Sequence, residues 1–394
     1  MPSVPGFFTL ASLAVISLSW ISPSPALAIV LPGPSGRFST GVNVRKLVDN
    51  SRLDPFAAGQ EKRALMVSAW YPVPKELCLE QGLIDYMPPR TARYEEAFTF
   101  SGIKLENGTL ETVRLQTCRT AEKNLCRVLK DVPAVLFSTG FTTSRHRYNV
   151  LARQLASAGY GVITIDHPYD AAFVEFPDGT AIPQKFFDEN VTLDQLELIT
   201  DTRRQDISFI LRELTTNSTL HDLFPSLHSC VITSKVPVLG HSLGGAAALA
   251  AAQNPSPVGG AANLDGSIFS LNKDIDAPVL LFGSNGHNRS APLGEGDDSW
   301  AAAWPHFRGW KTELDLQKGP HSTFSDLPFL IKALNAYDRL TPEYREALKW
   351  IDGYRSLDIV TTYLEAFIAL VASGKENPIL RSNRTELPEV IVVP

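Results

Sequence analysis

The hexapeptide at residues 240–245 (GHSLGG) constrains the fold more than any other part of this sequence. An apolar run, VPVL, precedes it and predicts a buried strand, while the alanine-rich run that follows predicts a helix. A serine at such a junction lies on a sharp strand-to-helix turn, with its hydroxyl above the edge of the sheet. The flanking glycines suit this turn, because side chains there would collide with the neighbouring strand and helix. Ser242 is therefore the candidate nucleophile, and the alternative is a structural serine in a glycine-rich turn.

Further apolar runs and helical patterns surround this turn. The predicted strands cover residues 63–72, 132–137, 161–165, 236–239, 261–264, 278–282 and 312–316, and the predicted helices cover residues 144–158, 193–214 and 243–252. Most of these strands lack the alternation of apolar and polar residues that marks a half-exposed sheet. Strands of this kind pair in parallel and are buried on both sides. We therefore predict an α/β fold, with a mostly parallel, doubly wound sheet and helices on both faces.

The other segments fit a single domain over residues 29–394. Residues 29–61 are rich in Gly, Pro and Ser, which predicts an irregular lead-in before the first strand. Residues 74–131 contain three of the four cysteines and little periodicity, so we interpret them as an insertion. Residues 341–374 begin with Thr-Pro and continue with an apolar helical face closed by glycine, which predicts a helical C-terminal tail. No second domain is predicted.

The first residues predict a signal peptide. Residues 7–20 form an uncharged apolar run that is short for a membrane span, and Ala26-Leu27-Ala28 has the small-x-small pattern of a cleavage site. We predict a signal peptide at residues 1–28, cleaved after Ala28, and a secreted protein; the alternative is an uncleaved membrane anchor. Sequons suit this route. They lie at Asn107, Asn190, Asn217, Asn288 and Asn383.

The four cysteines, Cys78, Cys118, Cys126 and Cys230, show no metal-type spacing. In an oxidising compartment we expect one or two disulfides, with three possible full pairings. The short separation of Cys118 and Cys126 would allow them to close a small loop, but the sequence leaves the pairing open.

Charge and motif content exclude several classes of function. The chain has 36 Lys and Arg against 42 Asp and Glu, a net charge of −6, so a nucleic-acid partner is not expected. It contains no metal-type grouping of Cys, His and Asp, no G-x-G-x-x-G and no phosphate-binding loop. We predict no cofactor and no metal, and the sequence leaves the oligomeric state open.

A serine nucleophile needs a histidine base, and in this type of fold the base follows the serine in the chain. Three histidines do so: His287, His306 and His321. His321 lies in a Gly-Pro-His-Ser loop directly after the last predicted strand, which is where the fold delivers its base. His287 lies one strand earlier, and His306 lies in a tryptophan-rich stretch. We therefore predict His321 as the base.

The carboxylate that orients the base is harder to assign. The common layout places it after the strand at 278–282, which nominates Glu295, Asp297 or Asp298. Asp265 lies one strand earlier, directly after the strand at 261–264. Placement alone leaves both positions open.

Several longer motifs resemble the plasma and type II platelet-activating factor acetylhydrolases, especially their secreted fungal relatives. They are LFSTGF (136–141), IDHPYDAAFVEFPDG (165–179), GHSLGGAAA (240–248), NLDGS (263–267) and GPHSTFSD (319–326). This resemblance implies an α/β-hydrolase fold, Asp265 as the acid, and His321 within an H-x-x-F-x-D element that includes Phe324 and Asp326. It also implies calcium-independent hydrolysis of a short sn-2 acyl chain from a glycerophospholipid.

Ester hydrolysis also requires N–H donors for the oxyanion of the tetrahedral intermediate. One is the backbone N–H of Leu243, the residue after the nucleophile. The family supplies the other from a turn that reads S-H-G-hydrophobic. Here the turn is Ser138-Thr139-Gly140-Phe141, which nominates the N–H of Phe141 and replaces the family's histidine with Thr139.

Two other stretches allow more than one interpretation. Residues 166–170 (DHPYD) precede the serine and end a strand, so we interpret them as structural or pocket-lining; direct contact with substrate is the alternative. Residues 297–310 contain Trp300, Trp304 and Trp310, which either pack over the core or form a lid that transiently contacts a lipid surface.

The leading hypothesis is a secreted serine esterase that hydrolyses the carboxylic ester of a small molecule or lipid through Ser242, His321 and Asp265. An acyltransferase or lactonising enzyme of a microbial secondary-metabolite pathway would use the same three residues. A catalytically silent binding protein with the same fold is the third hypothesis. Reaction of the serine with an organophosphonate separates the last from the first two.

Overall fold

A computed structural model describes residues 27–394, except residues 101, 187–190, 255–256, 270, 286, 291–296 and 349–350. The apolar run of the predicted signal peptide, the sequon at Asn190 and the candidate acid Glu295 therefore lie outside the described residues. The described sequon asparagines Asn107, Asn217 and Asn383 are exposed, whereas the Asn288 amide donates a hydrogen bond to Asp315 Oδ2 at 2.9 Å.

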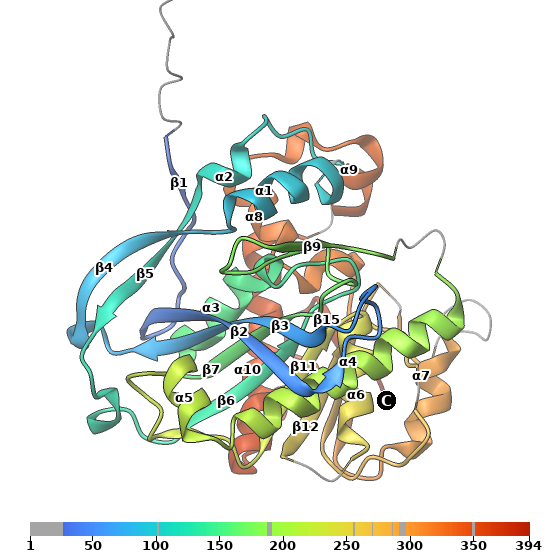
Figure 1. The fold of residues 1–394 in the computed structure, drawn as a ribbon. Coiled ribbons are helices and arrows are strands. Elements are labelled where there is room, and N and C mark those ends of the chain that lie inside the picture. Colours follow the sequence, from blue (N-terminus) through green and yellow to red (C-terminus); the bar gives the residue numbers. More distant parts are fainter. Residues whose placement is uncertain are drawn as a thin grey trace, which may run out of the picture.

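A large twisted sheet forms the centre of the molecule (Figure 1). Its middle strands run parallel in the order β14-β13-β12-β11-β6-β7, and β10 pairs with β6. They are β6 (Val132–Ser138), β7 (Gly161–Asp166), β10 (Val231–Ile232), β11 (Val236–His241), β12 (Val258–Leu264), β13 (Val279–Ser284) and β14 (Lys311–Leu316). Each strand predicted as part of the parallel sheet is present, which confirms the mostly parallel α/β architecture.

Antiparallel strands close both edges of this sheet. β3 (Lys62–Val73) pairs with β7, β2 (Ser39–Leu53) pairs with β3, and β15 (Val390–Val392) pairs with β14 at the opposite edge. The prediction of an irregular lead-in over residues 29–61 was therefore wrong. β2 is an edge strand with one face largely exposed, so polar residues interrupt its apolar pattern and hide the strand in the sequence.

Helices cover both faces of the sheet. One face packs against α3 (Asn149–Ala158), α8 (Leu327–Ala333) and α10 (Gly353–Ser373). The other packs against α4 (Leu193–Glu213), α5 (Asn217–Leu223), α6 (Leu243–Ala252) and α7 (Asp298–Ala303). Along β6, Val135 and Phe137 face the first layer while Ala134 and Leu136 face the second. Both faces of the strand are buried, which explains its continuous apolar run.

The insertion at residues 74–131 carries its own small elements. They are β4 (Cys78–Asp85), α1 (Pro89–Tyr94), α2 (Thr109–Thr112) and β5 (Val113–Ala121). β4 and β5 pair in antiparallel orientation although α1 and α2 lie between them in the sequence, and β1 (Ile29–Val30) adds to β5 in parallel. A hairpin of β8 (Phe173–Glu175) with β9 (Ala181–Pro183) follows β7. Figure 1 shows α1 and α2 beside α8 and α9 (Pro342–Leu348), although these pairs are far apart in the sequence.

One disulfide lies within the insertion, and a second connects the insertion to the rest of the fold. Cys78 pairs with Cys118 between β4 and β5, and Cys126 pairs with Cys230, which directly precedes β10. The small loop that Cys118 and Cys126 would have closed is not formed. All four cysteines are paired.

The C-terminal tail contains the helices that the sequence predicts. Asp352 caps α10 by accepting hydrogen bonds from the backbone of Tyr354 and Arg355, and Gly374 ends the helix with a left-handed φ of 71°. Among the described helices, α10 alone has the length and apolar composition of a membrane span. Most of its apolar side chains are packed in the core, which is typical of the central helix of a globular domain.

Candidate active site

The strand-to-helix turn after β11 holds Ser242 in a strained backbone conformation. Its φ and ψ are 56° and −127°, a region that residues other than glycine rarely adopt. The turn is tight because two glycines allow close contact of backbones. A Cβ on Gly240 would lie 2.1 Å from the Gly244 carbonyl oxygen, and a Cβ on Gly244 would lie 2.2 Å from that of Ser138. The predicted turn geometry is thus present at Ser242.

Asp265 directly follows β12, the neighbour of β11, and also has a positive φ, of 60°. Its carboxylate accepts hydrogen bonds from the backbone N–H and the hydroxyl of Ser284, both at 2.8 Å. It also contacts the Nδ1 atoms of two histidines: His321 at 2.6 Å and His287 at 2.9 Å. Burial alone would raise the pKa of Asp265, but the hydrogen bonds from His287 and His321 hold it well below its usual range.

His321 begins the short helical turn that follows β14, and its side chain is about half exposed. A buried aspartate fixes this loop. Asp326 accepts hydrogen bonds from the backbone of Val150 and Leu151 at 2.8 and 3.1 Å and from the Tyr86 hydroxyl at 2.9 Å. These bonds attach the loop to the N-terminal end of α3, which explains the aspartate of the H-x-x-F-x-D pattern.

Ser242, Asp265 and His321 line one pocket of about 710 Å³. Leu243 and Phe141, whose N–H groups are the predicted oxyanion donors, line the same pocket. In the described part of the chain neither N–H has a hydrogen-bond partner, so both are available to a bound oxyanion. The structure thus brings all five predicted site residues together.

His241 was not singled out in the sequence, yet it connects the parts of this site. Its Nε2 donates to the His321 carbonyl at 3.0 Å, and its Nδ1 accepts from the Tyr148 hydroxyl at 2.8 Å. The same hydroxyl accepts from the Gly140 N–H at 3.0 Å. Burial and the nearby His321 keep the pKa of His241 well below its usual value, which matches a neutral ring with these fixed roles. One chain of hydrogen bonds therefore joins the Phe141 turn to the His321 loop.

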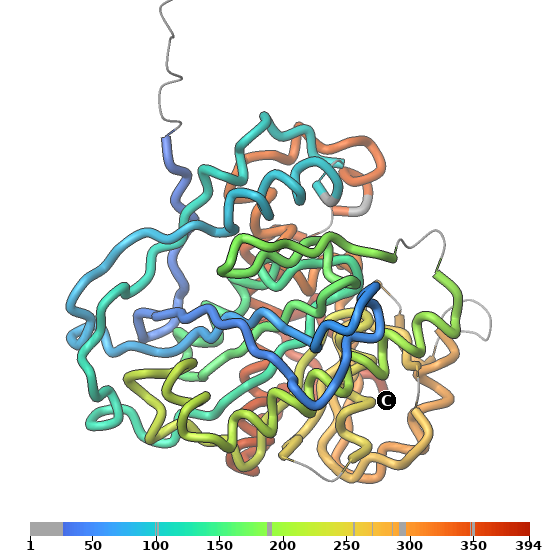
Figure 2. The backbone as a smooth tube through the Cα atoms, viewed as in Figure 1, coloured from blue at the N-terminus to red at the C-terminus, as the bar shows by residue number. Residues whose placement is uncertain are grey.

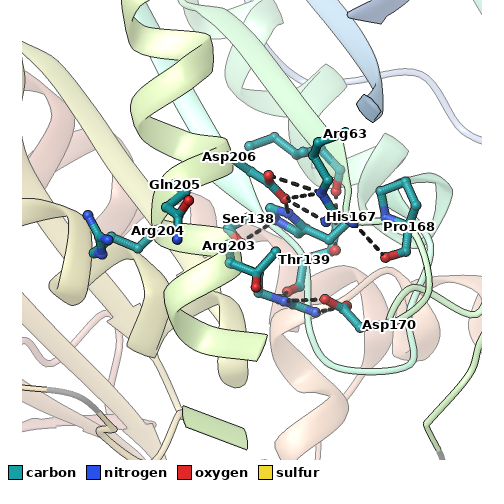
Figure 3. A network of polar contacts seen from close by, with 12 residues as sticks. Arg63, Ser138, Thr139, His167, Pro168, Asp170, Arg203, Arg204, Gln205 and Asp206 are labelled. Atoms are coloured by element: carbon teal, nitrogen blue, oxygen red, sulfur yellow. Dashed lines mark hydrogen bonds and ion pairs between the residues drawn. The ribbon is translucent and has the colours of Figure 1, made fainter. Parts of the chain in front are cut away.

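A buried ionic network lies beneath the Phe141 turn (Figure 3). Arg203 of α4 donates to the carbonyl oxygens of Thr139 and Gly140 and pairs with Asp170. His167 bridges the Ser138 hydroxyl, at 3.0 Å, and Asp206 of α4, at 2.9 Å.

These contacts support the structural interpretation of residues 166–170. His167 and Asp170 are both fully buried and satisfied by protein partners, and Asp166 pairs with Arg145 in the same way. Arg63 on β3 completes the network by binding Asp206 at 2.7 Å (Figure 3). The Phe141 turn is therefore anchored to α4 and β3 from below.

Of the other candidates from the sequence, His287 and Asp297 line the same pocket, whereas His306 and Asp298 are not among its lining residues. His287, which was set aside as a base, contacts Asp265, and its Nε2 lies 3.3 Å from Asp297 Oδ2. Asp297 caps α7 and Asp298 is the first residue of that helix, whereas the carboxylate that binds His321 Nδ1 is Asp265. His306 forms an exposed pair with Asp274. The only sequence feature that pointed to His287 was its position shortly after the predicted strand at 278–282.

The tryptophan-rich stretch packs largely against the core. Trp300 is fully buried and donates from Nε1 to the Gly266 carbonyl at 2.8 Å, and its ring lies 4.3 Å from that of His287. Phe307 is also buried, and Trp304 lies under the cations of Arg289 and Lys311. Among the described residues, no group of three or more His, Cys, Asp and Glu has the geometry of a metal site.

Comparison with known proteins places the chain among esterases. The sequence profile of platelet-activating factor acetylhydrolase, isoform II, matches residues 106–336. A probable 1-alkyl-2-acetylglycerophosphocholine esterase of Arthroderma benhamiae is 30% identical, over 94% of this chain and 95% of that protein. A solved ferulic acid esterase from Streptomyces cinnamoneus aligns with a TM-score of 0.78 and 30% identity, over 93% of this chain and 99% of that one.

A parallel sheet covered by helices on both faces, with a serine on the sharp turn between β11 and α6, defines an α/β-hydrolase. The chain belongs to the platelet-activating factor acetylhydrolase family, as the motifs predicted, and it is a carboxylic ester hydrolase.

Proposed function

We propose that Ser242 is the nucleophile of this esterase, with His321 as its base and Asp265 as the carboxylate that orients the base. Ser242 Oγ attacks the acyl carbonyl carbon while His321 takes up the hydroxyl proton. The C–O bond to the alcohol breaks as His321 returns the proton to the departing oxygen, leaving an acyl-enzyme. Water, deprotonated by His321, attacks this ester and releases the acid and free Ser242.

One observation carries the proposal: the 2.6 Å hydrogen bond between His321 Nδ1 and Asp265 in the pocket that Ser242 also lines. This bond fixes the tautomer that leaves Nε2 as the proton acceptor. The strained backbone of Ser242 gives a second line of support, because such conformations persist mainly where function requires them.

The N–H groups of Phe141 and Leu243 are the proposed oxyanion donors. The backbone at both positions is fixed. Arg203 binds the carbonyl of Gly140, directly before Phe141, and Leu243 is the first residue of α6. Donors fixed before the reaction need no reorganisation when the oxyanion forms, and each is worth on the order of 10²–10³ in turnover.

For the substrate we propose a glycerophospholipid with a short acyl chain at sn-2. The name of the Arthroderma relative supports this choice, and so does a cation in the pocket. Arg147 lines the pocket, is 8% exposed, and packs its guanidinium 5.2 Å from the centroid of the Phe100 ring. A substrate phosphate would supply an acceptor for this guanidinium.

A second candidate is a hydroxycinnamate ester, because the Streptomyces structure is described as a ferulic acid esterase and aligns over nearly its whole length. Phe141 and Phe269 line the pocket and offer aromatic surface to such an acyl group. The two candidates differ in charge, since only the phospholipid offers Arg147 a phosphate.

We also propose that the enzyme is secreted and glycosylated. Both pairs of cysteines form disulfides, which persist in oxidising compartments. Of the described sequons, Asn107, Asn217 and Asn383 are exposed enough to accept a glycan. Asn288 uses its amide for Asp315, so we expect this site to remain free of glycan.

The test uses the wild-type enzyme, Ser242→Ala and Ser322→Ala, a matched change of another pocket serine. Each is treated with an organophosphonate and assayed on p-nitrophenyl esters, a short sn-2 acyl phospholipid and methyl ferulate. Labelling and turnover should disappear in Ser242→Ala, with turnover falling by about 10⁴ or more, and persist in Ser322→Ala. Turnover that survives in Ser242→Ala would reject the nucleophile.

The substrate is tested with Arg147→Gln. For the phospholipid we expect KM to rise roughly 10-fold, since a charged hydrogen bond is lost, while p-nitrophenyl acetate is unaffected. Preference for methyl ferulate over the phospholipid, with no effect of Arg147→Gln, would favour the second candidate. If the organophosphonate labels Ser242 but the ester is consumed only when an alcohol acceptor is added, the enzyme is an acyltransferase.

A further inference from the structure

His287 occupies a position between two carboxylates at the edge of the active-site pocket. Its Nδ1 lies 2.9 Å from Asp265 Oδ1, while His321 uses the other oxygen of the same carboxylate at 2.6 Å. Its Nε2 lies 3.3 Å from Asp297 Oδ2. Asp265 therefore serves two histidines, one on each oxygen, and the mechanism above uses only one of them.

The ring of His287 is held in this place from several sides. It packs on Trp300 with ring centroids 4.3 Å apart, and its backbone N–H donates to the Ser284 carbonyl at 2.9 Å. Ser284 in turn binds Asp265 through both its N–H and its hydroxyl. Asp297 is fixed at the start of α7 by the backbone N–H of Ser299 at 2.8 Å. His287, Asp265 and Asp297 thus form a rigid unit.

We propose that His287 is a positioning residue of the hydrolytic reaction: an imidazolium held between Asp265 and Asp297 that moderates how strongly Asp265 supports a proton on His321. The proposal rests on the function proposed above, in which His321 is the base. It assigns a role to the histidine that follows β13 and to Asp297, neither of which takes part in the acyl transfer itself.

The charges around His287 favour its cationic form. Among the described residues, the charged or titratable groups that face it are Asp265 from the end of β12, Asp297 from the start of α7, and His321 behind Asp265. Burial would lower the pKa of His287, but its contacts with Asp265 and Asp297 outweigh this effect and raise the pKa to about 9. At neutral pH the ring is therefore protonated.

A second cation on Asp265 changes the behaviour of His321. In a serine esterase the carboxylate stabilises the imidazolium that forms on the base during the reaction. Because His287 and His321 each bind one oxygen of Asp265, the negative charge of this carboxylate is shared between them, and less of it supports His321 during the reaction. His287 thus extends activity toward acid, while Asp297 keeps His287 charged.

The experiment measures kcat/KM between pH 4 and 10 for the wild-type enzyme and His287→Asn. The asparagine amide can still donate to Asp265 from the position of Nδ1, but it carries no charge. We expect the acid limb of the profile to move up by about 1 pH unit, the usual size of such charge effects. Activity at pH 5 should fall roughly 10-fold, and activity at pH 8 should change little.

Two further variants separate this role from packing. Asp297→Asn removes the second carboxylate and should move the acid limb in the same direction. His306→Asn removes a histidine from the exposed pair with Asp274 and should leave the profile unchanged. A lower kcat at every pH in His287→Asn, with an unmoved acid limb, would overturn the proposal and leave only a packing role. Complete loss of turnover in folded His287→Asn would instead identify His287 as the base.

A measurement on the wild-type enzyme covers the case in which the variants do not fold. NMR of the enzyme labelled in its histidine rings should show one imidazole that stays protonated at pH 8. Absence of such a ring would overturn the inference. If the wild-type enzyme turns over esters and Ser242 is labelled while the acid limb does not move, only the inference about His287 fails; absence of labelling would reject the proposed function itself.

Discussion

At the scale of single residues, the pocket is marked by strained backbone. Ser242, Asp265 and Thr142, all of which line it, have φ values between 55° and 60°. Each such conformation costs of order 1–3 kcal/mol for a residue with a side chain, so surrounding contacts must hold it. At Ser242 and Asp265 these contacts are visible, since the Ser242 N–H donates to the Leu264 carbonyl and Ser284 clamps Asp265.

Gly240→Ala tests how tightly the turn at Ser242 is packed. The new Cβ would lie 2.1 Å from the Gly244 carbonyl oxygen, and because this atom belongs to the backbone of α6 it cannot rotate away. We expect a loss of roughly 3 kcal/mol or more in the free energy of unfolding and a lower kcat. Gly33→Ala is the control, since nothing lies within 4 Å of its Cβ. Equal melting temperatures for the two variants would contradict the packing argument.

At the scale of elements, α4 connects the Phe141 turn to β3 and β2. Arg203 and Asp206 point from α4 toward the Phe141 turn and β3, while Arg204 points away from both (Figure 3). Asp206 also binds Arg52 near the end of β2 at 2.7 Å. Figure 2 shows the blue N-terminal part of the chain crossing the yellow-green segment that contains α4, and the hydrogen bond from Arg52 to Asp206 joins residues 154 positions apart. The turn is thus fixed by the tertiary fold.

Arg203→Lys should lower kcat without a large change in KM. A lysine keeps the charge that Asp170 needs, but its ammonium cannot reach both the Thr139 and Gly140 carbonyls with the planar geometry of a guanidinium. If the Phe141 N–H is an oxyanion donor as proposed, kcat should fall about 10- to 100-fold because the Phe141 turn becomes less rigid. Arg204→Lys, on the same helix and paired with Asp201 near the surface, is the matched control. An equal effect of the two changes would rule out a specific role for Arg203.

The elements that the sequence could predict are those with a local signal. Buried parallel strands such as β6 and β11 appear as apolar runs, and α6 was predicted with the bounds that the structure has. The edge strands β2 and β15 were missed because many of their residues are exposed, so their sequences lack a regular apolar pattern and only the pairing with a neighbour defines them as strands.

In the candidate site, Ser242 and His321 were predicted from the motif and from their order in the chain, whereas the choice of Asp265 required the resemblance to a known family. The contacts of His241 and His287 arise only from the fold, so the sequence could not predict them.

The two disulfides should contribute differently to stability. The Cys78–Cys118 bridge spans 40 residues of sequence and Cys126–Cys230 spans 104, so the loop-entropy model predicts about 4 and about 5 kcal/mol, respectively. We expect the double Cys→Ser change at Cys126 and Cys230 to lower the melting temperature more. Neither pair lines the active-site pocket, so kcat should stay within a few-fold in both variants. A larger thermal loss at Cys78 and Cys118 would argue against the entropic account.

At the scale of the whole molecule, buried polar contacts join segments that are far apart in the sequence. Arg63 and Asp206 join β3 to α4, Arg203 joins α4 to Asp170, and Asp326 joins the His321 loop to α3. The helices α3 and α4, on opposite faces of the sheet, are therefore both connected to loops that line the pocket. The active site and the stability of the domain share the same contacts, so charges in the pocket must affect unfolding as well as catalysis.

Stability should fall at alkaline pH because of His287. In the folded protein its pKa is about 9, against an ordinary value near 6.5 in the unfolded chain. Its stabilising contribution is therefore complete below about pH 6.5 and is lost as the pH rises through 9; it amounts at most to about 3 kcal/mol. The melting temperatures of wild-type enzyme and His287→Asn should differ by a few degrees at pH 6 and converge near pH 10. A difference that is the same at both pH values would show that His287 stabilises the fold through packing alone, since packing on Trp300 does not depend on the proton.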